Sequence, residues 1–290
     1  MRIMSLFLWV LVTGIAFTDA AAQTIDAGSG EIPLVVPASY NKAKPVPLVV
    51  LLHGYTSSGS GQNAYMKISS LTNNYGFLFI APDGTQEDSE RKSRFWNATK
   101  ACCNFSGSTV DDSTYISNLI AEVKKQYSVD PSRVYLIGHS NGGFMSHRIA
   151  LDHPDTIAAI ASLAGVSPNT LKGPKAKYPV NILQIHGTKD STIRYEGGVI
   201  KDVAYPSAME TVQKWAAYNA GSTQAKSVRK KLDLDKRLDG KETTITRFNN
   251  GSVELWTINE GGHIPSLSEN FSKQVIEWLM AHPKDTSQID

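Results

Sequence analysis

The sequence predicts a single α/β domain, in which a mostly parallel central sheet carries helices on both faces. Short apolar runs, most of them ending in glycine or a polar turn, alternate with amphipathic segments along the chain. Strands buried on both faces form continuous apolar runs, and strands that alternate with helices favour a parallel sheet. With 290 residues, of which 41% are hydrophobic and 19% charged, the chain can form one sizeable core.

The predicted elements follow from these runs and from apolar residues at helical spacing. Strands are expected at 47–54, 77–84, 133–140, 157–165, 180–187 and 252–263, and helices at 111–127, 207–219 and 268–282. The first of these helices opens with Asp111 and Asp112, whose carboxylates suit a helix N-terminus. No linker or repeat divides the chain, so we expect one domain from 24 to 285.

The first 22 residues are expected to be a secretory signal peptide. Arg2 precedes the apolar run 3–17, and Ala20 and Ala22 are the small residues that a signal peptidase requires. A membrane anchor is the alternative, but the run is shorter than the roughly 20 residues that span a bilayer. We therefore expect a secreted or periplasmic protein that has no membrane contact after the signal is cleaved.

Charge and composition argue against several other classes of partner. The formal net charge is +2, and the most charged stretch, 226–237, mixes bases with acids, as a solvated surface element does. A nucleic-acid partner is therefore not expected. No metal-ligand cluster or phosphate loop is visible, so no metal is expected. Only a short polar tail follows the last predicted helix, so a dedicated polymer-binding module is not expected either.

A serine between two glycines marks the junction of a predicted strand and a predicted helix. Ser140 lies in Gly138-His139-Ser140-Asn141-Gly142, the Gly-x-Ser-x-Gly pattern of a nucleophile elbow. In such an elbow a sharp turn exposes the hydroxyl, and the glycines allow the strand and helix to approach closely. A simple tight turn is the alternative. The position between an apolar strand and an amphipathic helix favours a nucleophile.

A serine nucleophile needs a base, and the base needs an acid. His263 is the candidate base, because it follows two glycines just after the last predicted strand. Asp190 is the candidate acid, because it lies just beyond the strand that ends at Gly187; Asp202 and Glu260 are the alternatives. The order serine, aspartate, histidine is that of α/β-hydrolases.

The oxyanion of such a reaction needs backbone donors. We expect one from the amide of Asn141, which follows the nucleophile, and the other from the amide of Tyr55, after the first predicted strand. The alternative for the second segment is a turn rich in glycine and serine.

The two cysteines are adjacent, at Cys102 and Cys103. An exported protein can keep a disulfide, but neighbouring Cα atoms lie about 3.8 Å apart, below the usual disulfide range of roughly 4.4–6.8 Å. A vicinal disulfide acting as a local clamp and two buried thiols therefore both remain possible at this stage.

Together these motifs resemble the secreted α/β-hydrolase esterases of the polyhydroxybutyrate depolymerase and feruloyl esterase family. The resemblance rests on LLHGYTSSG, FWNATKACCN, GHSNGGFMSHRIA, HGTKD and GGH, and it covers nearly all of the chain after the signal. It implies serine-dependent ester hydrolysis without a cofactor, with Ser140, Asp190 and His263 as the triad. It also implies that Trp96 and the cysteine pair lie near the substrate cleft. We add His53 and His139 as substrate-binding positions.

The resemblance leaves the substrate open. Family members often have Trp-Pro-Gly after the histidine, whereas this chain has Ile264-Pro265-Ser266, which changes the expected rim of the pocket. We expect an exported serine esterase that hydrolyses polyhydroxyalkanoate oligomers or related hydroxy-acid esters. The alternative is a feruloyl or acetyl-xylan esterase. A prolyl-type serine peptidase and a catalytically silent binding protein on the same fold are lesser alternatives.

Overall fold

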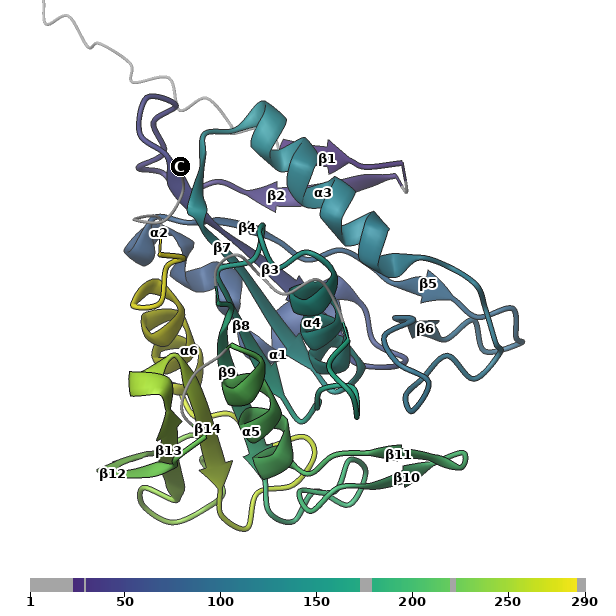
Figure 1. The fold of residues 1–290 in the computed structure, drawn as a ribbon. Helices are drawn as coiled ribbons and strands as arrows, with labels where there is room; N and C mark the ends of the chain where they lie inside the picture. The colour runs from purple at the N-terminus through teal and green to yellow at the C-terminus, as the bar shows by residue number, and fades with distance from the viewer. Residues whose placement is uncertain (1–22, 29, 173–178, 220–222, 286–290) are drawn as a thin grey trace, which may run out of the picture.

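The computed structural model describes residues 23–28, 30–172, 179–219 and 223–285 (Figure 1). The predicted signal segment, 1–22, lies outside the described residues. Within them, the chain forms one α/β domain around a ten-stranded sheet. In spatial order the strands are β1 (Gln23–Asp26), β2 (Glu31–Val35), β4 (Leu78–Ile80), β3 (Val46–Leu52), β7 (Val129–His139), β8 (Ala159–Leu163), β9 (Asn181–Gly187), β14 (Val253–Ile258), β13 (Thr243–Phe248) and β12 (Lys226–Leu232).

The middle of the sheet, from β4 to β14, is parallel, and the strands at both edges pair antiparallel. The six predicted strands form this parallel centre, so that prediction is confirmed. Sequence analysis missed the edge strands. Strand β12 shows why: its sequence KSVRKKL is mostly exposed, as charged edge strands that resist further pairing often are. The prediction of a solvated surface element there is confirmed.

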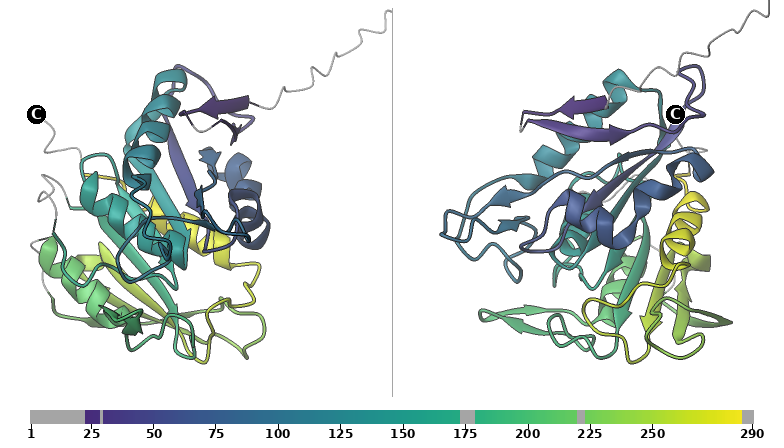
Figure 2. Two further views of the ribbon diagram at one scale, coloured as in Figure 1. Left: turned by 90° about the vertical axis from the view of Figure 1, so that its right-hand side faces the viewer. Right: turned by 180° about the vertical axis from the view of Figure 1, so that it is seen from behind.

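Helices cover both faces of the sheet (Figures 1 and 2). They are α1 (Gly59–Met66), α2 (Thr72–Tyr75), α3 (Asp112–Gln126), α4 (Asn141–Asp152), α5 (Ala208–Tyr218) and α6 (Phe271–Met280), with 3₁₀ turns at η1 (Ile68–Leu71) and η2 (Asn249–Gly251). The predicted helices are α3, α5 and α6, together with α4, the helix predicted after Ser140. None of the helices in the described residues is long and apolar enough to cross a membrane.

Alternate side chains along the central strands supply two separate hydrophobic cores. On β3, Leu48 and Val50 belong to the core beneath α3, α4 and α5, whereas Val49 and Leu51 belong to the core beneath α1 and α6. A strand buried on both faces needs apolar side chains in both directions, which explains the unbroken apolar runs in the sequence.

Two short antiparallel pairs extend from the same side of the domain (Figure 1). One is formed by β5 (Thr85–Gln86) and β6 (Arg94–Phe95), the other by β10 (Gly198–Ile200) and β11 (Val203–Tyr205). Both lie in connections that follow carboxyl ends of parallel strands, where α/β sheets bind ligands.

Helix α5 begins with a capping box, which predicts a measurable loss of stability in one variant. The Ser207 side chain accepts a hydrogen bond from the Glu210 amide, and the Glu210 carboxylate accepts one from the Ser207 amide. We expect Ser207→Ala to lower the free energy of unfolding by about 1 kcal/mol, measured by urea denaturation. Ser227→Ala, on exposed β12, is the control and should change it by less than about 0.5 kcal/mol. Equal effects of the two substitutions would contradict the assignment.

Candidate active site

The carboxyl ends of four parallel strands bring the proposed triad to one edge of the sheet. Strand β7 ends at His139, directly before Ser140, and β9 ends at Gly187, three residues before Asp190. Strand β14 pairs with β9 and leads into the loop that carries His263. Strand β3, next to β7, leads to Gly54 and Tyr55. Residues that are distant in sequence therefore meet because parallel strands end together.

Ser140 has the backbone conformation of a nucleophile elbow. Its φ is 53° and its ψ is −118°, a positive-φ conformation that few non-glycine residues adopt. A Cβ on Gly138 would lie 2.1 Å from the Gly142 carbonyl oxygen, and one on Gly142 would lie 2.2 Å from the Leu52 carbonyl oxygen. Only glycine fits at these two positions, so the turn has the geometry expected of a nucleophile elbow.

The structure brings Ser140, His263 and Asp190 into one hydrogen-bonded line. The Ser140 Oγ lies 3.0 Å from His263 Nε2, and His263 Nδ1 lies 2.7 Å from Asp190 Oδ2. This spacing lets the neutral imidazole donate from Nδ1 to the carboxylate and accept the serine proton at Nε2. The serine is 8% exposed, so a substrate can still approach it.

The two alternative acids lie elsewhere. Asp202 is exposed in the turn between β10 and β11, and Glu260 is paired with Lys189 at 3.7 Å. Asp190 is the only one of the three candidates whose carboxylate contacts the His263 ring. Of the three candidate acids, Asp190 is therefore the one placed to pair with His263.

The carboxylate of Asp190 is buried but well supplied with donors. Its Oδ1 accepts hydrogen bonds from the amides of Thr192 and Ile193, at 2.9 and 2.8 Å. Its Oδ2 lies between His263 and His186, the latter at 3.2 Å. Burial raises the pKa of Asp190, but its interactions with His186 and His263 outweigh burial and hold the pKa below its ordinary value. The carboxylate therefore stays ionised at neutral pH.

The loops that carry the acid and the base are bonded to each other. The Lys189 amide donates to the Gly261 carbonyl at 2.8 Å, and the Glu260 amide donates to the Thr188 hydroxyl at 2.8 Å. A Cβ on Gly187 would lie 2.2 Å from the Gly261 carbonyl oxygen, so this close approach also requires glycine. These contacts fix the position of Asp190 relative to His263.

The segments that carry the two expected oxyanion donors both adjoin Ser140. Asn141 is the first residue of α4, where an amide has no acceptor within the helix. A Cβ on Gly54 would lie 3.5 Å from the Ser140 Cβ, which places the following residue, Tyr55, at the same site. The assignment of these two amides as oxyanion donors stays a prediction.

A family comparison agrees with this geometry. Residues 35–230 match the model of the phospholipase/carboxylesterase family, which is more than half of the chain. The chain belongs to the phospholipase/carboxylesterase family. The matched segment contains Ser140 and Asp190, and His263 lies C-terminal to it.

Individual relatives of this chain are named for different activities. The chain is 27% identical to feruloyl esterase B of Piromyces equi over 237 residues, which covers 78% of this chain and 41% of that protein. It is 26% identical to poly(3-hydroxyalkanoate) depolymerase C of Paucimonas lemoignei over 252 residues, covering 80% and 56%. The chain thus spans about half the length of these relatives.

A solved structure shows the same fold. The acetyl xylan esterase from Aspergillus awamori superposes with a TM-score of 0.62 over 89% of this chain and 98% of that one, at 18% identity. At this identity the likeness concerns the fold, which is the α/β-hydrolase fold that the sequence analysis predicted.

Two of the expected substrate-binding residues are wrong as substrate contacts, because both are fully buried. The His53 ring uses both nitrogens on backbone groups: Nδ1 donates to the Gly54 carbonyl at 2.8 Å, and Nε2 accepts from the Gly84 amide at 2.8 Å. The Trp96 indole donates to the His53 carbonyl at 3.0 Å. These side chains support the loops behind the nucleophile and present no surface to a substrate.

Trp96 is tied to the nucleophile elbow through its backbone. The Asn141 side chain accepts a hydrogen bond from the Trp96 amide at 2.7 Å and donates one to the Trp96 carbonyl at 3.0 Å. The sequence analysis gave Asn141 only a backbone role. The structure adds that its side chain fixes the loop after β6 against the elbow.

Cys102 and Cys103 are joined by a disulfide in this same loop, which decides between the two alternatives of the sequence analysis. Both residues are buried, and Cys102 Sγ lies 3.9 Å from the Asn141 side-chain nitrogen. The pair thus lies near the site, as the resemblance implied.

His139 supports the base. Its Nε2 lies 3.0 Å from the His263 carbonyl oxygen, and the two rings lie 5.3 Å apart. Burial lowers the pKa of His139 to about 4, so the ring is neutral at physiological pH and donates from Nε2. This contact positions the loop of His263, and His139 remains only a predicted substrate contact.

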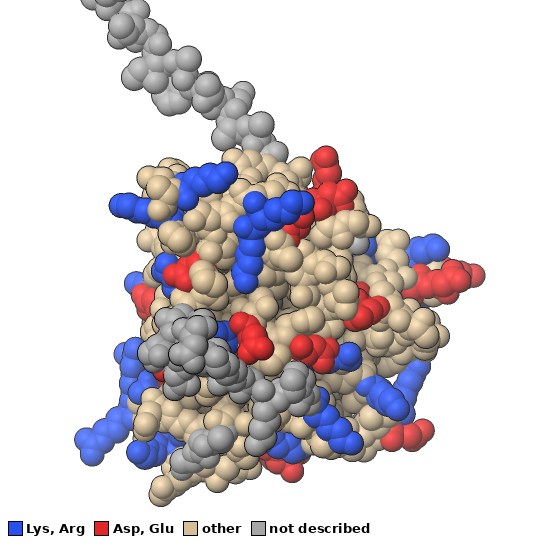
Figure 3. All heavy atoms as spheres, turned by 45° about the horizontal axis from the view of Figure 1, so that its top comes forward, with Lys and Arg blue, Asp and Glu red and all other residues tan. Residues whose placement is uncertain are grey.

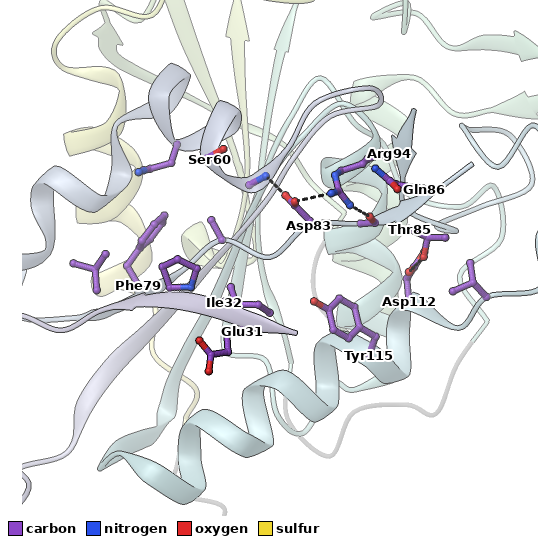
Figure 4. A pocket seen from close by; sticks show the side chains of 17 residues that line it. Glu31, Ile32, Ser60, Phe79, Asp83, Thr85, Gln86, Arg94, Asp112 and Tyr115 are labelled. Carbon is purple, nitrogen blue, oxygen red and sulfur yellow. Dashed lines mark hydrogen bonds and ion pairs between the residues drawn. The ribbon is translucent and has the colours of Figure 1, made fainter. Parts of the chain in front are cut away.

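The structure also contains a cavity of about 710 Å³ (Figure 4). It is lined by residues of β2, α1, α3 and the β5–β6 pair, and none of the three triad residues lines it. Its polar groups satisfy one another, since Asp83 pairs with Arg94 at 3.2 Å and accepts from the Gly59 amide at 2.8 Å. Within the described residues, no group of three acidic, histidine or cysteine side chains is arranged to hold a metal ion.

The buried histidines predict that the protein is destabilised by mild acid. The pKa of His139 and of His147 is about 4, because both are buried, whereas an unfolded histidine has a pKa of about 6.5. The unfolded state therefore binds more protons between these values, so stability is complete above pH 6.5 and falls toward pH 4. We expect melting temperatures measured from pH 7 to pH 4.5 to fall accordingly.

The control is His139→Gln, whose amide can keep the bond to the His263 carbonyl without titrating. Below pH 6.5 its free energy of unfolding should fall less steeply than that of the wild type. The difference in slope is up to about 1.4 kcal/mol per pH unit, because unfolding takes up one proton fewer. A slope identical to that of the wild type would contradict the assignment.

Proposed function

We propose that this chain is a serine esterase that hydrolyses carboxylic esters through an acyl-enzyme. The observation that carries the proposal is the continuous hydrogen-bonded line from Ser140 through His263 to Asp190. The family match and the elbow conformation support the same reaction. A catalytically silent binding protein on this fold would not need these three side chains to be hydrogen-bonded to one another.

The proposed reaction begins when Ser140 Oγ attacks the ester carbonyl carbon and its proton passes to His263 Nε2. The Asp190 carboxylate stabilises the resulting imidazolium, and the amides of Tyr55 and Asn141 donate to the tetrahedral oxyanion. Collapse of this intermediate expels the alcohol, which takes the proton from His263. Water then loses a proton to His263, attacks the acyl-enzyme and releases the acid and the free Ser140.

For the acyl group, we propose hydroxyalkanoate oligomers or related hydroxy-acid esters, as expected from the sequence. The similarity to a poly(3-hydroxyalkanoate) depolymerase over 80% of the chain supports this class. We also propose that the protein is exported to the periplasm or the medium, and that its ligands are small or oligomeric esters, not nucleic acid. Charges of both signs are distributed over the face drawn in Figure 3, in keeping with the last point.

One observation favours hydroxycinnamoyl esters of plant polysaccharides as a second candidate. The Phe105 side chain is 39% exposed and packs edge-on against Tyr55, with ring centroids 5.4 Å apart. Lys201, from the β10–β11 turn, lies 4.4 Å from the Phe105 ring centroid. An exposed aromatic ring next to a proposed oxyanion donor can pack against an aromatic acyl group.

Replacing the nucleophile tests the reaction. We expect Ser140→Ala to lower kcat for 4-nitrophenyl acetate and butyrate on the order of 10⁶, to background, because no other group can form the acyl-enzyme. A fluorophosphonate probe should label the wild type and not this variant. Ser227→Ala, on the exposed edge strand, should behave like the wild type in both assays. Wild-type activity in Ser140→Ala would overturn the proposal.

Replacing the exposed aromatic ring tests the second substrate class. We expect Phe105→Ala to lower kcat/KM for methyl ferulate by about threefold to tenfold, since an aromatic contact contributes about 0.5–1.5 kcal/mol. The rate with 4-nitrophenyl acetate should be unchanged. Val199→Ala, at another exposed apolar side chain, is the control. Hydrolysis of hydroxybutyrate oligomers without hydrolysis of methyl ferulate would exclude the second class.

A further inference from the structure

A chain of buried polar side chains leads from Asp190 into the core and has no part in the reaction described above. Its members are His186 and Gln184 on β9, His147 on α4 and Trp215 on α5, and all four are fully buried. Buried polar groups need partners, and here the partners are mostly one another. The chain therefore connects the acid of the triad to a helix on the face of the sheet.

Trp215, at the end of this row of side chains farthest from Asp190, fixes the direction of the hydrogen bonds in the row. The Trp215 indole nitrogen lies 2.9 Å from His147 Nδ1, and an indole N–H can only donate. His147 therefore carries its proton on Nε2, which lies 3.0 Å from the Gln184 Oε1. Burial lowers the pKa of His147 to about 4, so the ring is neutral and has one proton to donate.

The middle of the chain is fixed independently. The Gln184 nitrogen donates to the Gly165 carbonyl at 2.6 Å, and this contact sets the orientation of the amide because a carbonyl can only accept. The same nitrogen lies 3.3 Å from His186 Nδ1, which must then accept. His186 consequently carries its proton on Nε2.

The contacts of His186 next to Asp190 also indicate a proton on Nε2. His186 Nε2 lies 2.7 Å from the Ile193 carbonyl oxygen and 3.2 Å from Asp190 Oδ2, and both of these atoms are acceptors. Three separate observations thus assign one tautomer to His186. Its N–H is hydrogen-bonded to the Ile193 carbonyl, and the Asp190 oxygen that also receives the proton of His263 lies 3.2 Å from the same nitrogen.

We infer that His186 is a positioning residue for the proposed reaction, held in a single tautomer by Gln184, His147 and Trp215 so that it fixes Asp190 Oδ2 opposite His263. This inference rests on the proposed serine esterase mechanism. In that mechanism Asp190 must face the His263 Nδ1–H, and His186 adds a contact at Oδ2 to the two backbone amides that hold Oδ1.

The donor also changes how strongly Asp190 attracts the imidazolium. Each hydrogen bond to the carboxylate disperses part of its charge, so loss of the His186 donor leaves more charge to stabilise protonated His263. Two other titratable side chains lie close to these histidines. The His139 ring lies 5.3 Å from the His263 ring, and the Tyr195 ring lies 5.8 Å from the His186 ring. Removal of the donor should therefore move the acid limb of kcat/KM to higher pH.

The first experiment measures the tautomers directly. In ¹⁵N-histidine-labelled full-length protein, long-range ¹H–¹⁵N correlation should show His147 and His186 protonated on Nε2 and unprotonated on Nδ1. Trp215→Phe removes the initial donor, so His147 should then populate both tautomers. Trp278→Phe is the matched control: the Trp278 indole nitrogen has no hydrogen-bond partner in the described residues, and the His147 and His186 signals should not change. Protonation of His186 on Nδ1 in the wild type would overturn the inference.

The second experiment measures the effect on the reaction. His186→Leu keeps much of the volume but removes the donor. We expect kcat to fall by about 10- to 100-fold, as for outer-shell partners of catalytic groups, with KM changed by less than about twofold. The acid limb of kcat/KM should move up by about half a unit to one unit. His186→Gln, whose amide nitrogen can occupy the Nε2 position, should restore most of kcat and the wild-type limb.

The outcomes separate this inference from the proposed function. If Ser140→Ala is inactive while His186→Leu matches the wild type in kcat and pH profile, the esterase mechanism stands and the positioning role is wrong. Equal losses in His186→Leu and His186→Gln, with an unshifted acid limb, would show that His186 only fills the core. If Ser140→Ala retains full activity, the proposed function is wrong. The tautomer of His186 is measured independently of activity and is not affected by that outcome.

Discussion

The buried carboxylate of Asp190 is the interaction on which the site depends. Burial of a charge is unfavourable unless donors replace water, and here two backbone amides and two imidazoles do so. Each donor comes from a part of the chain that must be in place first: the loop after β9, the end of β9 itself and the loop after β14. Asp190 therefore has its full set of donors only when these three segments are correctly assembled.

A second constraint is the close approach of backbones around the nucleophile. Gly138 and Gly142 let α4 begin directly against β3 and β7, and Gly187 lets the loop of Asp190 touch the loop of His263. A methyl group at any of these positions would collide with a carbonyl oxygen. The unfavourable positive φ of Ser140 persists because the surrounding packing permits no other arrangement.

The loop between β6 and α3 and the core beneath α4 and α5 serve the site from opposite directions. Asn141 binds the backbone of Trp96, so the elbow and the disulfide loop hold each other. From the core, the row of buried polar side chains that starts at Trp215 ends at Asp190. Residues that contact no substrate thus determine where the serine, the base and the acid lie, which suits chemistry that requires fixed distances.

The sequence by itself determined the parallel centre of the sheet, the elbow at Ser140 and the order of the triad, because continuous apolar runs and glycine patterns are local signals. It did not reveal the edge strands, whose polar residues resemble loops, nor the burial of His53 and Trp96. The roles of His186 and of the Asn141 side chain depend on partners 4 to 45 residues away in the chain. Only the tertiary structure decides which of several histidines and aspartates meet, since hydrogen bonds across a folded core leave no periodic pattern in sequence.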